Sequence, residues 1–118
     1  HAAAQQGLPA RTLMSEYAPG QFEVSLAHRP DALAAADDAA MWKRLVRGVA
    51  ARHGLTATFM AKPLENEPGS AMHIHQSLVD TKTGRNIFTG ENGEPSKLFH
   101  HFLAGQQTYL PSAMCLFA

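Results

Sequence analysis

Two histidines, His73 and His75, stand two residues apart in a stretch where apolar and polar side chains alternate. Successive side chains of a strand point to opposite faces, so both imidazoles would share one face, about 7 Å apart along the strand. Met72, Ile74 and Leu78 fall on the other face and form its predicted apolar side. From sequence alone, such a pattern is more often a solvated sheet face than a metal site.

Two glutamates flank a Pro-Gly turn earlier in the chain. Glu23 belongs to the alternating segment 21–26, and Glu16 precedes the turn at Pro19-Gly20, so the two can meet across that turn. Two carboxylates and an imidazole are a reasonable ligand set for Mg²⁺ or Mn²⁺, because these hard ions prefer oxygen and tolerate one nitrogen. We therefore expect Glu16, Glu23 and His73 to point into one cavity, while a solvent-facing surface remains the alternative.

Other ionisable side chains carry weaker signals. His100 and His101 are neighbours on a predicted helix and face different directions, so we interpret them as surface residues. Asp37-Asp38 is typical of a solvated helix face, and Cys115 among apolar neighbours is typical of an inert core thiol. The chain has no glycine-rich phosphate loop of either common type.

Strands and helices must position these residues. Apolar alternation and turn residues predict strands at 10–17, 21–26, 56–61 and 70–79, the last with a short partner at 86–88 after a Thr83-Gly84 turn. Helical spacing and capping signals predict helices at 2–6, from Pro30 with Asp31 in the first turn to a stop at Gly54, and from Pro95 onward with a break at Pro111. The mixed order of elements favours an α+β fold.

The composition excludes several classes of protein. The 118 residues carry ten basic and ten acidic side chains, a balance that argues against binding to nucleic acid or to an anionic membrane. A single cysteine excludes a disulfide framework and a Cys-rich zinc module. No apolar run reaches the roughly 18 residues of a membrane span, and the start has no signal-peptide pattern. We expect one cytoplasmic domain.

Three motifs carry a resemblance to a known family. They are Glu16-Tyr-Ala-Pro-Gly-Gln-Phe-Glu23, Ala57-Thr-Phe-Met-Ala-Lys-Pro63 and Gly69-Ser-Ala-Met-His-Ile-His-Gln-Ser-Leu78. The order of these motifs and their residue sequences resemble the catalytic domain of glutamine synthetases over nearly the whole chain. Around Glu67-Pro68-Gly69 and Phe22-Glu23-Val24 the local sequence resembles that of the gamma-glutamylpolyamine (gamma-glutamylputrescine) synthetases, one branch of the family. The resemblance implies that residues 1–118 are a central part of an α+β catalytic barrel of antiparallel strands and packed helices.

The resemblance also implies roles for individual residues. Glu16 and Glu23 match two glutamates that bind one catalytic divalent metal, and His73 matches the histidine that binds a second metal beside the ATP phosphates. Gly69 matches a glycine that touches the glutamate substrate. The implied ATP-binding residues are His75, Gln76, Ser77 and His28, the last in a segment, 26–28, that matches the family poorly.

The implied activity is an ATP-dependent ligation of glutamate to ammonia or a polyamine through gamma-glutamyl phosphate, in a homo-oligomeric ring with active sites between subunits. Two positions depart from the family pattern: Ala71 replaces a glycine, and Pro68 replaces the asparagine of ordinary glutamine synthetases. Loss of that asparagine fits an enzyme that accepts an amine larger than ammonia. The residue that deprotonates the amine is not identifiable in this segment.

The extent of the chain adds a further expectation. The last predicted helix ends at Met-Cys-Leu-Phe-Ala without a polar tail, which is typical of a truncated piece, and such a piece is expected to be inactive alone. Two alternatives remain open at this point. One is a catalytically inactive, glutamine-synthetase-like structural or binding module, and the other is an unrelated metal-dependent hydrolase that converged on Glu, Glu and His.

Overall fold

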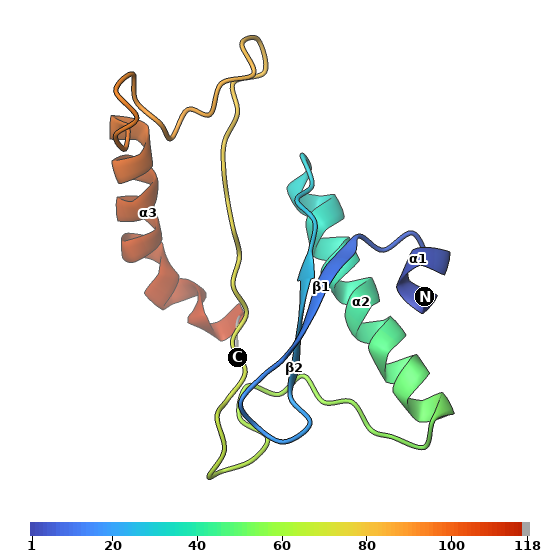
Figure 1. Ribbon diagram of the computed structural model, residues 1–118. Helices are drawn as coiled ribbons and strands as arrows, with labels where there is room; N and C mark the ends of the chain where they lie inside the picture. Colours follow the sequence, from blue (N-terminus) through green and yellow to red (C-terminus); the bar gives the residue numbers. More distant parts are fainter. Residues whose placement is uncertain (117–118) are drawn as a thin grey trace. The chain divides into compact units, whose positions relative to one another are not determined.

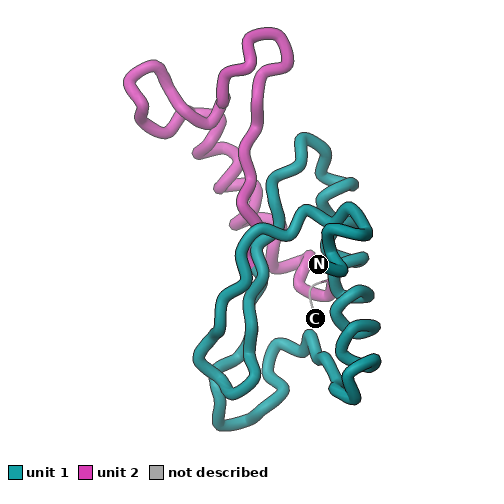
Figure 2. Tube along the Cα trace, turned by 45° about the vertical axis from the view of Figure 1, so that its right-hand side comes forward, with its two compact units in different colours: residues 1–72 teal, residues 73–118 magenta. Residues whose placement is uncertain are grey.

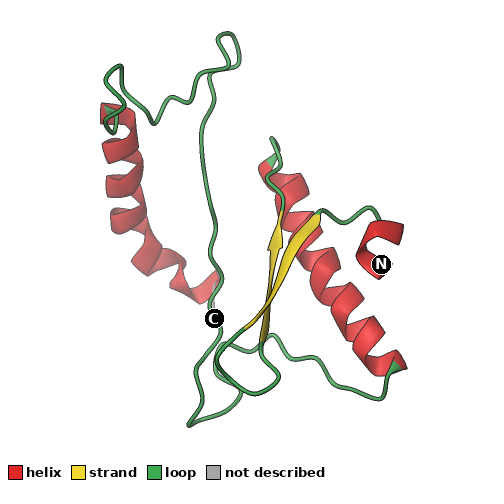
Figure 3. Cartoon of the chain, viewed as in Figure 1, coloured by secondary structure: helices red, strands yellow, loops and turns green. Residues whose placement is uncertain are grey.

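The computed structural model describes residues 1–116 (Figure 1). The chain divides into two compact units, residues 1–72 and the residues from 73 onward, each of which is described by itself (Figure 2). Helices and one antiparallel strand pair make up the regular structure, as the α+β prediction required (Figure 3). None of the helices within residues 1–116 is both long and apolar enough to cross a membrane.

The first unit is built on a β-hairpin of β1 (Ala10–Ser15) and β2 (Phe22–Leu26). The strands are antiparallel, with Leu13 opposite Val24, Met14 opposite Glu23 and an irregularity between Ala10 and Thr12. The prediction of strands at 10–17 and 21–26 is confirmed, with ends one or two residues shorter. The hairpin forms because the two alternating segments are joined by a short turn, which brings them side by side as antiparallel strands.

Helix α2 (Ala32–Arg52) follows the hairpin, close to the predicted bounds. Asp31 is the N-cap and not a first-turn residue as predicted: its carboxylate accepts the backbone N–H groups of Leu33 and Ala34 at 2.8 and 3.1 Å. That bonding satisfies two of the four N–H groups that a helix start leaves without partners. The predicted stop at Gly54 is confirmed, with φ of 69° just beyond the helix.

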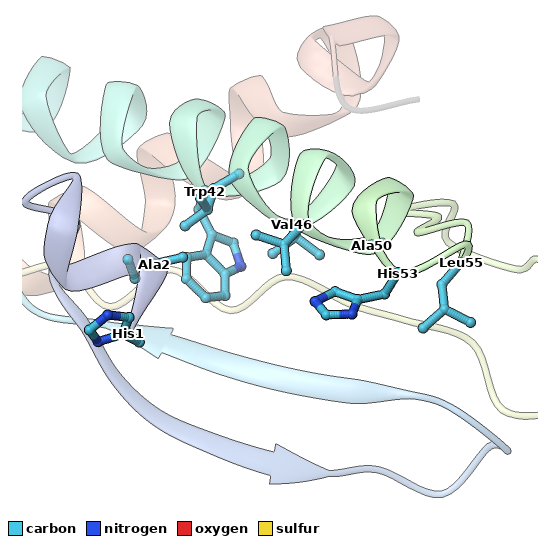
Figure 4. Close-up of a pocket in the computed structure, with 10 residues that line it drawn as sticks. His1, Ala2, Trp42, Val46, Ala50, His53 and Leu55 are labelled. Carbon is cyan, nitrogen blue, oxygen red and sulfur yellow. The ribbon is translucent and has the colours of Figure 1, made fainter.

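A short helix α1 (Ala2–Gln5) precedes the hairpin and lies beside α2. The two helices border an apolar pocket of about 430 Å³ (Figure 4). The pocket is lined by His1, Ala2, Ala3, Trp42, Leu45, Val46, Val49, Ala50, His53 and Leu55. Leu45 is the buried residue of α2, so this face of the helix carries the small core of the first unit.

The predicted strands at 56–61 and 70–79 do not form. Both segments are extended but join no ladder within the described residues, and Met72 and Ile74 are 65% and 61% exposed instead of facing a core. A strand requires a neighbour for its N–H and C=O groups, and alternation alone does not supply one. In segment 56–61, Phe59 instead contacts α2, where its ring lies beneath the Lys43 ammonium and the Arg47 guanidinium, 5.9 and 5.2 Å from the ring centroid.

The second unit begins with the extended segment and turns back at 80–85. The predicted Thr83-Gly84 turn is confirmed, with φ of 71° at Gly84, and its short partner forms only an isolated bridge between Val79 and Asn86. Backbone bonds join Ile87 N–H to Leu78 C=O and Asp80 N–H to Arg85 C=O, both at 2.9 Å.

Helix α3 (Lys97–Ala113) is anchored by an aromatic cluster at its start. Phe88, which is 8% exposed, lies 5.5 Å from Phe99 in an edge-to-face arrangement and 5.0 Å from Phe102. Ser96 caps the helix by accepting the Phe99 N–H and donates its hydroxyl to Ile87 C=O. These contacts fix the end of the turn-back segment onto the helix.

Two expectations about the C-terminal part are wrong. The helix does not break at Pro111 but continues to Ala113 and into the short 3₁₀ helix η1 (Met114–Leu116), because a proline this near the end removes only one backbone bond. Cys115 is exposed and not a core thiol. His100 and His101 are exposed, as predicted.

Candidate metal and substrate site

The hairpin places Glu16 and Glu23 on one face. Met14 is opposite Glu23, and the backbone bond from Glu16 N–H to Gln21 C=O continues the same register by one pair, so Glu16 and Glu23 fall on the face of the hairpin that Met14 shares. Residues in such diagonal positions are usually about 7–8 Å apart between Cα atoms, within the span of two glutamate side chains that bind one cation. Glu16 is half-buried and Glu23 is exposed.

The turn between the two glutamates is closed by its backbone. The Glu16 N–H donates to Gln21 C=O at 2.9 Å, and the Gln21 N–H donates to Ala18 C=O at 3.0 Å. Gly20 has φ of 72°, a conformation that glycine adopts without steric cost. Ala18 is the buried residue of the turn, at 8% exposure, while its neighbours Tyr17 and Pro19 are exposed.

Sequence reasoning missed the side chain of Gln21. Its Oε1 accepts the Ala18 N–H at 3.1 Å, and its Nε2 donates to Gly69 C=O and to Ser70 Oγ, both at 3.1 Å. The only available signal was its position directly after Pro-Gly, and that position gives no indication of a partner 48 residues away.

Gly69, the predicted glutamate-binding residue, is tightly surrounded on one side. A Cβ at this position would lie 2.7 Å from the Ala61 carbonyl oxygen, which also accepts the Ser70 N–H at 2.7 Å. The Lys62 ammonium donates to Glu67 C=O at 2.6 Å and closes the loop before Gly69. Glycine is therefore required here by packing, whether or not a substrate approaches.

The predicted nucleotide-binding residues lie apart along the chain. His75, Gln76 and Ser77 lie in the extended segment that opens the second unit and are exposed, as is the predicted metal ligand His73 in the same segment. Gln76 accepts a hydrogen bond from Gln106 of α3 at 3.2 Å. His28 is exposed and follows β2 in the first unit.

The metal site is only partly assembled by the described residues. Within residues 1–116, no three His, Cys, Asp or Glu side chains lie close enough together to hold a metal ion. Glu16 and Glu23 share a face, and in the described part of the chain no hydrogen bond or ion pair engages either carboxylate. Their oxygen chemistry fits a hard divalent cation, and the participation of His73, which belongs to the other unit, stays a prediction.

The electrostatics of the first unit include one ion pair outside this site. Arg29 donates to both carboxylate oxygens of Asp38, at 2.6 and 3.0 Å. This bonding lowers the pKa of Asp38 and raises the pKa of Arg29. The prediction of a fully solvated Asp37-Asp38 pair is therefore half right, because Asp37 is exposed while Asp38 ties the start of α2 to the preceding loop.

Comparisons with known proteins place these motifs. A family model described as glutamine synthetase, catalytic domain, matches residues 1–118. The chain is 46% identical over 113 residues to gamma-glutamylputrescine synthetase of Escherichia coli, covering 96% of this chain and 24% of that protein. It is 45% identical over 101 residues to glutamate–isopropylamine ligase of a Pseudomonas species, covering 84% of this chain and 22% of the relative.

Ordinary glutamine synthetases match comparably well. The enzyme of Pyrococcus horikoshii is 45% identical over 87 residues, covering 74% of this chain and 19% of the relative. No solved structure matches. The chain thus spans about a quarter or less of the relatives that it matches. The family match over all 118 residues confirms the resemblance carried by the three motifs, and this chain belongs to the glutamine synthetase family, within its catalytic domain.

Proposed function

We propose that the polypeptide carrying this chain is an ATP-dependent carboxylate–amine ligase that joins the side-chain carboxylate of glutamate to an amine. The observation that carries the proposal is the match of residues 1–118 to the glutamine synthetase catalytic domain. The common face of Glu16 and Glu23 supports it, because the motif that carries the resemblance folds as a closed hairpin with both carboxylates on one side.

Glu16, Glu23 and His73 would hold Mg²⁺ or Mn²⁺. The ions would neutralise phosphate oxygens and bring two anions together. Gly69 would contact glutamate, and His75, Gln76, Ser77 and His28 would contact ATP. The glutamate carboxylate takes the γ-phosphoryl group of ATP and releases ADP; an unprotonated amine then attacks the acyl phosphate, forms the amide and releases phosphate.

The proposed acceptor is a primary amine larger than ammonia. Overall identity does not decide this point, because a putrescine enzyme and an ordinary glutamine synthetase match at 46% and 45%. Pro68, next to Gly69, supports the larger amine: proline removes a backbone donor and fixes its own φ, at a position where the resemblance to ordinary glutamine synthetases implies an asparagine amide. The names of two relatives, which act on putrescine and isopropylamine, support the same class.

Assembly is part of the proposal. A homo-oligomeric ring with active sites between subunits, located in the cytoplasm, is the arrangement that family membership supports.

The test is an assay of ADP release by the complete polypeptide that carries this sequence, with ammonia, putrescine and isopropylamine compared by kcat/KM. We expect release to require glutamate and an amine, with preference for an alkylamine. A preference for ammonia contradicts the acceptor, while no release with any amine supports the inactive structural module instead.

A further inference from the structure

The Gln21 side chain uses every hydrogen-bonding group it has. Its carbonyl oxygen accepts from the backbone of Ala18, inside the turn that carries the two glutamates. Its amide nitrogen, which offers two protons, donates to Gly69 C=O and to Ser70 Oγ. One side chain therefore joins the hairpin turn to the segment that follows Pro68.

The two joined segments are distant in sequence and rigid for separate reasons. On one side, Glu16 N–H and Gln21 C=O close the turn at 2.9 Å. On the other side, Ala61 C=O accepts the Ser70 N–H at 2.7 Å and leaves no room for a side chain at Gly69. A link between two rigid segments transmits position, whereas a link to a loose loop would not.

Gln21 also has a fixed relation to Glu23. The two residues are separated by one position, so their side chains project to the same side of the chain. Gln21 is half-buried, and no other side chain of the described residues 1–116 bonds the turn to Gly69 or Ser70. The spacing between the carboxylates and the Gly69 backbone therefore depends on this amide.

We propose that Gln21 is a positioning residue, which sets the glutamate-bearing turn at a fixed distance from the Gly69–Ser70 backbone. The inference rests on the proposed function for its catalytic consequence, since that function places a metal at the glutamates and the substrate at Gly69. A displacement of the turn against the Gly69–Ser70 backbone separates the proposed metal ligands from the proposed glutamate contact, and therefore weakens the binding of glutamate without changing the binding of ATP.

The chemistry of the amide supplies two informative variants. Gln21→Met has a similar length and loses all three bonds. Gln21→Glu keeps an oxygen that accepts from Ala18 but has no proton for Gly69 or Ser70. Gln107→Met, on the exposed face of α3, is a matched control with no bond to lose.

The experiment has two readouts on the complete polypeptide. The first is amide hydrogen exchange: in Gln21→Met we expect exchange at Ala18 and Ser70 to be faster by about 10-fold, and in Gln21→Glu only at Ser70. This readout needs no activity, so it tests the bridge even where ligase activity is absent. Unchanged exchange at Ser70 in both variants overturns the inference.

The second readout compares the KM for glutamate with the KM for ATP. Both variants should raise KM for glutamate by about 10-fold with KM for ATP unchanged, while Gln107→Met matches the parent. A merely structural role would reduce the active fraction, and so lower kcat without this split. Loss of kcat alone, with KM for glutamate unchanged, overturns the positioning role. Absence of ADP release in the parent itself counts against the proposed function, and the exchange data then decide the bridge.

Discussion

The hairpin of the first unit and the extended segment that opens the second unit were both predicted to be β-strands. Both alternate apolar and polar residues, and both carry residues of the proposed metal site on the polar side. The hairpin became a strand pair with a defined register, whereas segment 70–78 has no ladder partner among the described residues. Alternation therefore specifies which residues share a face, and a partner strand decides whether that face is held in place.

The difference has consequences for the site. In the hairpin, backbone bonds and the Gln21 amide fix Glu16 and Glu23 before any ligand arrives. In the extended segment, no partner strand among the described residues pairs with His73, and both Met72 and Ile74 are exposed. We infer that the glutamate part of the site is preorganised locally and that the histidine part depends on further packing.

The largest expected effect is the loss of ligase activity when a hairpin carboxylate is removed. Glu23→Ala in the complete polypeptide should lower kcat by about 10³-fold, because phosphoryl transfer between two anions depends on charge neutralisation. The exposed Glu91→Ala is the matched control and should leave kcat within about twofold. Residues 1–118 alone should show no turnover, since they offer at most three metal ligands. Turnover by the isolated chain that Glu23→Ala abolishes would show that these 118 residues form a complete enzyme.

The second effect concerns the aromatic cluster that anchors the other unit. Phe88→Ala should destabilise it by about 3 kcal/mol, because a buried ring with two aromatic neighbours is deleted. Phe88→Leu retains most of the volume and should cost less than half as much. Urea titration followed by tryptic cleavage near Lys97 measures the loss. Equal sensitivity of the two variants would show that the cluster contributes little.

The comparison also explains how much the sequence could predict. The hairpin and α2 were predicted because their signals are local: a Pro-Gly turn, helical spacing, and an aspartate expected in the first turn beside Pro30. The predictions of strands at 56–61 and 70–79 were wrong because a strand needs a partner elsewhere in the chain, and the residues of a segment do not specify that partner. Gln21 was missed for the same reason, since its partners lie 48 and 49 residues away.

The family was recognised correctly although two strands were not, because the order and residue sequences of three motifs are specific to a family even where strands cannot be assigned. The candidate residues follow from those motifs. Two of them, Glu16 and Glu23, are related by backbone pairing, which places them on one face of the hairpin.

A smaller effect is expected at the start of α2. Asp31→Ala removes an acceptor for the Leu33 and Ala34 N–H groups, and it should lower the free energy of unfolding of the first unit by about 1 kcal/mol. Asp37→Ala, on an exposed position of the same helix, is the control and should change it by less than about 0.5 kcal/mol. Thermal unfolding by circular dichroism measures both. Equal effects of the two substitutions would show that the Asp31 N-cap does not stabilise this helix.

The smallest effect is a pH dependence confined to the turn at 80–85 of the second unit. The Asp80 carboxylate accepts the backbone N–H groups of Thr83 and Lys82 and the Thr83 hydroxyl, at 2.7, 3.0 and 2.9 Å. These bonds, the one from the Thr83 backbone first, lower the pKa of Asp80 below its ordinary 3.8. The folded turn thus favours the charged carboxylate, and its stabilisation is present above pH 3.8 and is lost as the pH falls through the lowered pKa.

NMR titration can test this turn against the hairpin. As the pH falls below 3.8, the protection of the Thr83 and Ile87 amides, relative to the intrinsic exchange rate at each pH, should decrease, while the Glu16 amide, held by backbone pairing to Gln21, should keep its protection. Asp80→Asn retains an acceptor oxygen without a charge, so it should remove the pH dependence of the turn and leave the hairpin unchanged. A carboxyl signal of Asp80 that titrates at or above 3.8 would contradict the charged turn. Simultaneous loss of protection at Glu16 and Thr83 would show instead that the hairpin and the turn open together.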